Sequence, residues 1–258
     1  MGILNVTPDS FSDGGAHSTA EAAILHAEAM IAEGADIIDI GGESTRPGAD
    51  PVSSEDEANR TLPVIRALAG SGAVISIDTM KAEVAEAAVN AGARIINDVS
   101  ACTSDKDMVR VVAESGAGIV LMHMKGEPRT MQSNPSYEDV VQEVAAYLKA
   151  RANSLVTAGV AQESIMLDPG IGFGKTMTHN LRLLANLEKI SEAGFPVLAG
   201  ISRKSFIGTI TGRDVNERLA GTLAGLVWCL TKGIHVLRVH DVPQTLDAIK
   251  VVKALKEV

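Results

Sequence analysis

The apolar run GIHVLRVHDV, residues 233–242, carries two basic side chains at alternating positions, Arg238 and His240. Side chains of a strand alternate between two faces, so this pair shares one face. Two cations on one face of an otherwise apolar strand can bind an anion such as phosphate or pyrophosphate. The alternative is an internal ion pair with Asp168 or Asp241. We consider it less favourable, because Asp241 directly follows His240 and points to the opposite face.

Polar groups also stand at the carboxyl edge of the other apolar runs. They are Asn5, the loop from Gly41, Asp78, Asn97, His123, Asp168, the run 202–205 and the pair Arg238 and His240. The hydrogen-bonding groups of Asp78, Asn97 and Asp168, set among apolar positions, suit a planar heterocycle with several N–H donors and ring acceptors. Lys204 and Arg46 add positive charge for an anion. Asn5 offers a neutral oxygen that could complete the coordination shell of Mg²⁺.

Short runs rich in Ile, Val and Leu alternate with longer runs rich in Ala and Glu along the chain. The pattern predicts helices near residues 19–34 and 55–69 and about eight strand–helix units, the number that closes a (β/α)₈ TIM barrel. The strands are expected in MGILNVT, ADIIDIGG, AVISIDT, ARIINDVS, AGIVLMHM, SIMLDPG, FPVLAGISRKS and IHVLRVHDV. The carboxyl ends of all strands of a barrel meet at one mouth, so the polar groups would form a single active site there. A doubly wound open sheet is the alternative fold.

The composition limits the class of protein. A chain of 258 residues with 46% hydrophobic residues suits a single α/β domain over residues 1–258. The net charge of −9 and the 3% aromatic content argue against nucleic-acid binding. No apolar run reaches the roughly 18 residues of a membrane span, and no signal peptide is recognisable. The two cysteines, Cys102 and Cys229, match no zinc spacing. We therefore expect a cytoplasmic protein without nucleic-acid or membrane partners.

The run DPGIGFGKT, residues 168–176, ends like a phosphate-binding P-loop. However, Pro169 occupies the position of the first P-loop glycine, and the glycine spacing does not fit a dinucleotide-binding fingerprint. We interpret the glycines instead as positions that let the loop approach a flat ligand closely.

Eight motifs occur in a fixed order along the chain: GILNVTPDSFSDGG, IDIGGESTRPGA, ISIDT, INDVSA, LMHM, DPGIGFGK, GISRKSFIG and RVHDV. In this combination the sequence resembles the dihydropteroate synthase family, from Met1 to the last predicted helix. The resemblance implies a transferase that condenses 6-hydroxymethyl-7,8-dihydropterin pyrophosphate with p-aminobenzoate. The products would be 7,8-dihydropteroate, an intermediate of folate biosynthesis, and pyrophosphate. The resemblance also implies dependence on Mg²⁺, a homodimer and inhibition by sulfonamides.

The same resemblance assigns roles to the site residues. The pterin would be held by Asp78, Asn97, Asp168 and Lys204, and the diphosphate by Thr45, Arg238 and His240. The p-aminobenzoate would lie near Phe11, Arg46, Pro47, Phe173 and Ser205, and Asn5 would bind the metal ion. The groups expected to take part in catalysis are Asp78, Lys204, Arg238 and His240.

The implied reaction needs no nucleophilic side chain, because p-aminobenzoate brings its own amine. Pyrophosphate would depart first, with Mg²⁺, Arg238 and His240 accepting its charge. An ionised Asp78 would stabilise the positive charge that develops on the pterin. The segments 9–15 and 44–49 would then close over the site and exclude water.

Three other functions remain as alternatives. A corrinoid-dependent folate methyltransferase would share the Asp, Asn and Asp pocket, but it has no pyrophosphate to bind and should lack the Arg238 and His240 pair. A non-catalytic pterin-binding relative would have lost the anion-binding or metal-binding groups. A barrel isomerase acting on sugar phosphates would need an acid–base pair without a heterocycle pocket. Release of pyrophosphate distinguishes the synthase from all three.

Overall fold

The computed structural model describes residues 1–7, 16–45 and 48–257 of the 258-residue chain. Parallel strands alternate with helices along these described parts, as the sequence predicts. The strands are β1 (Gly2–Asn5), β2 (Ile37–Gly41), β3 (Val74–Asp78), β4 (Ile95–Asp98), β5 (Gly118–Met122), β6 (Ile165–Asp168), β7 (Leu198–Ala199) and β8 (Val236–Leu237). The helices are α1 (Ala16–Ala32), α2 (Ser54–Leu68), α3 (Ala82–Ala91), α4 (Met108–Ser115), α5 (Val140–Thr157), α6 (Met177–Ala185), α7 (Glu188–Ser191), α8 (Ser205–Thr211), α9 (Leu219–Thr231) and α10 (Val242–Lys256), with 3₁₀ turns at Gln162–Ser164 and Val215–Glu217.

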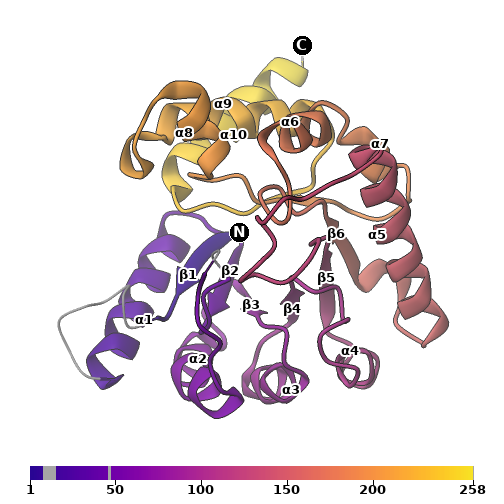
Figure 1. The fold of residues 1–258 in the computed structure, drawn as a ribbon. Helices are drawn as coiled ribbons and strands as arrows, with labels where there is room; N and C mark the ends of the chain where they lie inside the picture. Colours follow the sequence, from indigo (N-terminus) through magenta and orange to yellow (C-terminus); the bar gives the residue numbers. More distant parts are fainter. Residues whose placement is uncertain (8–15, 46–47, 258) are drawn as a thin grey trace.

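The strands close into a barrel (Figure 1). Strands β1 to β6 pair in sequence order in one parallel sheet, and β7 pairs with β8. Two bridges join these sheets, one between Leu167 of β6 and Val197, the other between Gly2 of β1 and Val239. The second bridge is supported by a hydrogen bond from Ile3 N to Val239 O at 3.0 Å. The closed ring confirms the predicted TIM barrel and excludes the open doubly wound sheet.

Helices surround the outside of the ring of strands (Figure 1). Strand residues on the outer face, such as Ile38, Ile40 and Ile77, are fully buried. Small buried residues of the helices, such as Ala27 of α1 and Ala88 of α3, let the helices lie close to the strands. The main apolar core therefore lies between strands and helices, and the inner face of the barrel can carry polar groups.

The register of the sheet aligns four of the predicted site positions. Asn5 pairs with Gly41, Gly41 pairs with Asp78, and Asp78 pairs with Asn97. These residues stand at one level, at or next to the carboxyl ends of β1 to β4. Asp168 is the last residue of β6. The mouth predicted from the sequence therefore exists, and the polar side chains of Asn5, Asp78, Asn97 and Asp168 lie on its rim.

The two helices predicted near the start of the chain differ from the observed ones by one to three residues at their ends. Helix α1 ends at Ala32 because the chain then turns through Gly34, which has a φ of +101°. Helix α2 begins at Ser54, since the Ser53 side chain accepts a hydrogen bond from Asp56 N at 3.0 Å and caps it. Within the described ranges, none of the helices has the length and apolar character needed to cross a membrane.

Candidate active site

Asp39, in the middle of β2, is the centre of a polar network inside the barrel. Its side chain is fully buried. Ser76 Oγ donates to Asp39 Oδ1 at 2.6 Å, and Asn97 Nδ2 donates to Asp39 Oδ2 at 3.0 Å. An ionised carboxylate only accepts hydrogen bonds, so the amide nitrogen of Asn97 must face Asp39. The amide oxygen of Asn97 is thereby directed away from Asp39 and can accept from a ligand.

Arg238 follows β8 and reaches across the barrel to β2 and β3. Its Nε donates to Asp39 Oδ2 at 2.6 Å, and its Nη2 donates to Asp78 Oδ2 at 2.9 Å. The Arg238 side chain is 20% exposed, and that of Asp78 is 11% exposed. An internal ion pair of Arg238 therefore does exist. Its partners are Asp39 and Asp78, whereas the sequence suggested Asp168 or Asp241.

The two carboxyl groups predicted to bind a heterocycle have unusual protonation behaviour. Burial raises the pKa of Asp78 from 3.8 to about 7, although the nearby charge of Arg238 opposes this rise. Burial also raises the pKa of Asp168, against the opposing effects of Lys204 and of the Gly170 N–H, which donates to Asp168 Oδ1 at 2.7 Å. The protonation state of both groups can therefore change when a ligand donates hydrogen bonds to them or brings positive charge near them.

Lys204 immediately precedes α8 and turns toward the loop that follows β6. Its ammonium donates to Ile171 O and lies 4.5 Å from the centre of the Phe173 ring. Burial lowers the pKa of Lys204 to about 8, while the charge of Asp168 opposes and that of Arg238 reinforces this lowering. The structure therefore brings Lys204 and Phe173 together beside the end of β6.

His240, which follows β8, lies beside Ser202, which belongs to the segment that follows β7. Ser202 Oγ and His240 Nδ1 are 3.0 Å apart, and His240 N donates to Ser202 Oγ at 3.3 Å. The neighbouring Asp241 pairs with Arg203, at 2.5 Å between Nη2 and Oδ1 and at 3.1 Å between Nε and Oδ2. This bidentate pair fixes the loop after β7 against the start of α10.

Three glycines shape the loop that follows β6. Gly170, Gly172 and Gly174 have φ values of +65°, +88° and +61°. A Cβ at Gly170 would lie 2.0 Å from His123 O, and one at Gly174 would lie 2.2 Å from Lys125 O. The glycines thus let this loop pack on the backbone of the loop after β5. The interpretation that they serve mainly a flat ligand is wrong for Gly170 and Gly174.

Lys175, which resembles the P-loop lysine, points into the protein. Its Nζ lies 2.9 Å from His123 Nδ1, Gly170 O and Phe173 O, and 3.1 Å from His123 O. Burial lowers the pKa of Lys175 to about 7, and burial beside this lysine lowers the pKa of His123 to about 3. Lys175 therefore joins the loops after β5 and β6. Its hydrogen-bonding groups are used by the protein and not by a phosphate.

The residues predicted around the pyrophosphate and the p-aminobenzoate are only partly described. Thr45 lines a small hollow together with Asp78 and Met80. Ser205 is exposed at the start of α8, directly after Lys204. Phe11, Arg46 and Pro47 lie outside the described residues, so their assignment stays a prediction.

Asn5 could contribute a single oxygen to a metal ion. A Cβ at Gly41 would lie 3.8 Å from Asn5 Oδ1 and 3.7 Å from Asp78 Oδ2, so both oxygens flank this glycine. In the part of the chain that is described, no three His, Cys, Asp or Glu side chains gather as a metal site. Mg²⁺ commonly uses one or two protein oxygens and takes its other ligands from substrate phosphates and water. The residues present fit that mode of binding.

The chain matches a known family over most of its length. Residues 1–240 match the family model described as pterin binding enzyme. The dihydropteroate synthase of Neisseria meningitidis serogroup B is 50% identical over 261 residues, which cover 99% of this chain and 92% of the relative. That of Escherichia coli is 49% identical over 255 residues, which cover 98% of this chain and 90% of the relative. The chain belongs to the dihydropteroate synthase family.

Solved structures of dihydropteroate synthases share the fold. The Xanthomonas albilineans enzyme with 4-aminobenzoic acid has a TM-score of 0.94 at 47% identity, covering 100% of this chain and 93% of that one. The Yersinia pestis enzyme with a sulfonamide drug has a TM-score of 0.94 at 42% identity, covering 100% and 94%. The Xanthomonas albilineans enzyme with 7,8-dihydropteroate has a TM-score of 0.91 at 45% identity, covering 100% and 93%.

Two buried residues of this dihydropteroate synthase family member escaped the sequence analysis. Asp39 stands two positions before Gly41 and therefore on the inner face of β2, so strand alternation could have identified it. A carboxylate inside an otherwise apolar strand was the available signal. For Lys175 the sequence offers no comparable signal, because the inward turn of its loop depends on contacts with the loop after β5.

Proposed function

We propose that the protein condenses 6-hydroxymethyl-7,8-dihydropterin pyrophosphate with p-aminobenzoate to give 7,8-dihydropteroate and pyrophosphate. The observation that carries this proposal is the arrangement of the barrel mouth. Asp78, Asn97 and Asp168 line one side, and Lys204 and Arg238 reach toward them from the segments that follow β7 and β8. Membership of the dihydropteroate synthase family supports the same reaction.

The pterin is recognised by groups whose hydrogen-bonding roles differ. The carboxylates of Asp78 and Asp168 accept hydrogen bonds from pterin N–H groups. Asn97 presents its amide oxygen, because its amide nitrogen is already bound to Asp39. Lys204 donates to a ring acceptor, and its position over the face of Phe173 supports a stacked, planar ligand beside it.

In the chemical step, the bond between the pterin methylene carbon and the pyrophosphate oxygen breaks, and its electron pair leaves with pyrophosphate. Arg238 and His240 take up the developing negative charge, with Thr45 as a further contact. The ionised Asp78 stabilises the pterin cation. The amine of p-aminobenzoate then forms the new C–N bond, and the resulting ammonium releases one proton to water. Phe11, Arg46, Pro47, Phe173 and Ser205 form the proposed p-aminobenzoate site.

Arg238 has to change partners for this role. In the structure it pairs with Asp39 and Asp78, so arrival of the anion would draw its guanidinium toward the pyrophosphate. Arginine suits such an exchange, because its planar group offers five N–H donors and can keep one partner while it binds another. The pair with Asp39 is the one we expect to persist, since Asp39 is fully buried.

Mg²⁺ is the proposed cofactor, with Asn5 as its protein ligand. When bound, the ion supplies a positive charge that makes pyrophosphate a better leaving group. Asn5 would hold the ion through one neutral oxygen, which would leave the charge of the ion available to the substrate. We also propose a cytoplasmic homodimer, on the basis of the family resemblance. Analytical ultracentrifugation of the purified protein measures the oligomeric state.

The deciding experiment is release of pyrophosphate on mixing the two substrates with the protein and Mg²⁺. We expect stoichiometric formation of 7,8-dihydropteroate, and no release when p-aminobenzoate is left out. A methyltransferase, a non-catalytic pterin-binding protein or a sugar phosphate isomerase would release no pyrophosphate. Sulfamethoxazole should inhibit in competition with p-aminobenzoate. Full turnover at drug concentrations far above that of p-aminobenzoate would contradict the proposed sulfonamide sensitivity.

A further inference from the structure

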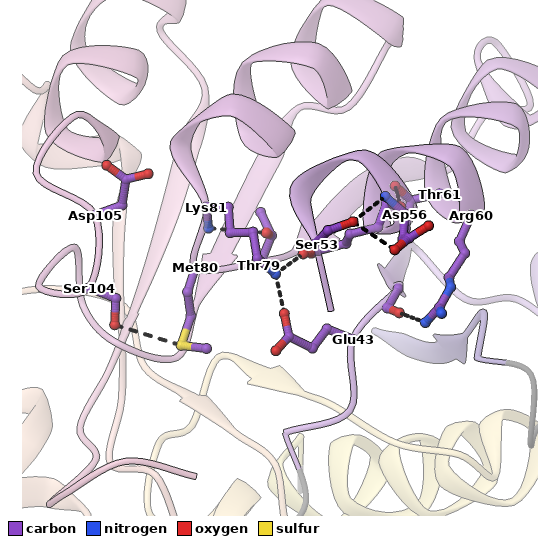
Figure 2. Close-up of polar contacts among 12 residues, drawn as sticks. Glu43, Ser53, Asp56, Arg60, Thr61, Thr79, Met80, Lys81, Ser104 and Asp105 are labelled. Carbon is purple, nitrogen blue, oxygen red and sulfur yellow. Dashed lines mark hydrogen bonds and ion pairs between the residues drawn. The ribbon is translucent and has the colours of Figure 1, made fainter. Parts of the chain in front are cut away.

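Lys81 lies between two carboxylates from two other parts of the barrel mouth (Figure 2). It follows β3 and immediately precedes α3. Its ammonium pairs with Glu43, in the segment after β2, and with Glu57 of α2, the latter at 2.5 Å. The side chains of Lys81, Glu43 and Glu57 are 25%, 14% and 1% exposed. One ammonium group thus connects three consecutive segments around the mouth.

Gly42, the first residue of the segment after β2, packs closely against α2. A Cβ at Gly42 would lie 2.9 Å from Thr61 Cγ2 and 3.0 Å from Glu57 Cγ, so only glycine fits without a shift. Arg60 Nη1 donates to Gly42 O at 2.8 Å. Gly42 is therefore held by α2, and the next residue, Glu43, is held by Lys81. The path of the chain toward Thr45 is set by these contacts.

Thr45 is where this segment reaches the active site. It lines one hollow with Asp78, Glu43 and Glu57. Thr45 is one of the proposed pyrophosphate contacts, so its position relative to Asp78 bears on binding of the anion. Displacement by as little as about 1 Å of a group that binds a reacting substrate can lower activity roughly 100-fold.

The charge of Lys81 also matters beside an anion site. Burial raises the pKa of Glu57, and the hydrogen bond from Lys81 opposes this rise. Partial burial alone would lower the pKa of Lys81, but its pairs with Glu43 and Glu57 raise it. Lys81 therefore stays protonated between Glu43 and Glu57. Without the Lys81 ammonium, the two carboxylates would repel an incoming pyrophosphate. They would also repel each other, which would displace Glu43 and the segment after β2 that carries it.

We propose that Lys81 is a positioning residue, which fixes Thr45 over the pyrophosphate site by holding Glu43 against Glu57. The inference rests on the proposed function. Lys81 itself does not touch the substrate, so it should affect binding of the pyrophosphate group while leaving recognition of the pterin ring intact.

Lys81→Met tests this inference, with Lys149→Met as a matched control at an exposed position of α5. In Lys81→Met we expect the KM for the pterin pyrophosphate to rise at least tenfold, while kcat falls less than threefold. Affinity for free 6-hydroxymethylpterin, measured by calorimetry, should stay within twofold. Lys81→Arg should recover most of the loss, because arginine can pair with both carboxylates. Lys149→Met should resemble the wild-type protein in every measurement.

An unchanged KM in a folded Lys81→Met variant would overturn the inference, as would an equal loss of affinity for free pterin and pterin pyrophosphate. If Lys81→Met does not fold, Glu43→Gln replaces it, because this variant keeps the Lys81–Glu57 pair. Its affinity for the pterin pyrophosphate should then fall at least threefold, and unchanged affinity would reject the role of Lys81. Absence of pyrophosphate release by the wild-type protein would instead reject the proposed function.

Discussion

The two sides of the barrel mouth are built in different ways. The acidic side, with Asp78, Asn97 and Asp168, belongs to β3, β4 and β6 of a continuous six-stranded sheet. The cationic side, with Lys204, Arg238 and His240, follows β7 and β8, which are two residues long each and join the main sheet through single bridges. Strand pairing therefore positions the acidic side chains, whereas the cationic ones depend on contacts made by their own side chains.

These contacts cross the barrel. Arg238 pairs with Asp39 and Asp78, and Lys204 donates to the backbone of the loop after β6. The acidic side thus holds the cationic side in place before a ligand arrives. A pterin pyrophosphate carries a hydrogen-bonding ring for one side and a negative charge for the other, so it could replace the pairing between Arg238 and Asp78 by contacts of its own. This difference supports the proposal that the side positioned by strand pairing, together with Lys204, binds the ring, whereas Arg238 and His240 accept the charge of the leaving group.

The largest expected effect comes from removing the charge of the acidic side. In Asp78→Asn, the rate of the chemical step should fall roughly 100-fold or more, because the carboxylate no longer stabilises the pterin cation. Affinity for the pterin pyrophosphate should fall much less, about tenfold, since the amide still accepts a hydrogen bond. Single-turnover kinetics at saturating substrates separates the two effects. An unchanged chemical rate would reject the electrostatic role of Asp78.

Removal of Arg238 should reveal how far the two sides depend on each other. Arg238→Met leaves Asp39 buried with a charge and without its ion pair, which should destabilise the fold by about 3 kcal/mol. The double variant Asp39→Asn/Arg238→Met removes both charges and should recover most of that stability. Urea unfolding of the two variants and the wild-type protein measures this difference. Equal stability of Arg238→Met and the wild type would mean that the cationic side is held by other contacts.

The pH dependence of stability should report on Asp78. Its pKa is about 7 in the folded protein, above the ordinary value of 3.8 that applies in the unfolded chain. The unfolded chain therefore loses this proton first, and the fold loses stability as the pH rises from about 4 to about 7. Asp78→Asn cannot ionise, so its stability relative to the wild type should increase by roughly 2–4 kcal/mol between pH 4 and pH 8. Thermal unfolding of both proteins across this range is the measurement, and a constant difference would contradict the raised pKa.

The smallest effect concerns the orientation of Asn97. In Asp39→Asn the Asn97 amide loses its charged acceptor, and the new side-chain amide can present either its oxygen or its nitrogen to Asn97. Affinity for free 6-hydroxymethylpterin should therefore fall about threefold to tenfold. Ser76→Ala is a suitable control, because it removes another hydrogen bond to Asp39 without changing the charge there. Calorimetry should show a clearly smaller loss in Ser76→Ala. Equal affinities of Asp39→Asn and the wild type would mean that Asn97 is oriented without Asp39.

The sequence was sufficient for those features that follow from strand alternation and from the convergence of strand ends. It predicts the closed barrel and the placement of Asp78, Asn97 and Asp168 at one mouth, because parallel strands bring their carboxyl ends together. The helix predicted near residues 55–69 also agrees with α2 to within one residue at each end.

The features that the sequence did not reveal depend on contacts between distant residues. Arg238 is separated from Asp39 by 199 positions, so its pairing with Asp39 and Asp78 and not with Asp168 or Asp241 depends on how the distant strands are placed in the barrel. Lys175 turns inward because three carbonyl oxygens and His123 surround it, and local sequence does not encode that environment. The joining of Glu43, Glu57 and Lys81 likewise appears only when three separate segments meet.

The division of the mouth into a ring-binding side and an anion-binding side is tested most directly in the Asp39→Asn background. The variants Asp39→Asn and Asp39→Asn/Arg238→Met share the same acidic side and differ only at Arg238. Calorimetry should show that the additional loss of Arg238 weakens binding of the pterin pyrophosphate about 30-fold, equivalent to about 2 kcal/mol. Binding of free 6-hydroxymethylpterin should change less than threefold. Equal losses for both ligands would show that Arg238 supports the pocket as a whole, and the assignment of Arg238 to the pyrophosphate would then be wrong.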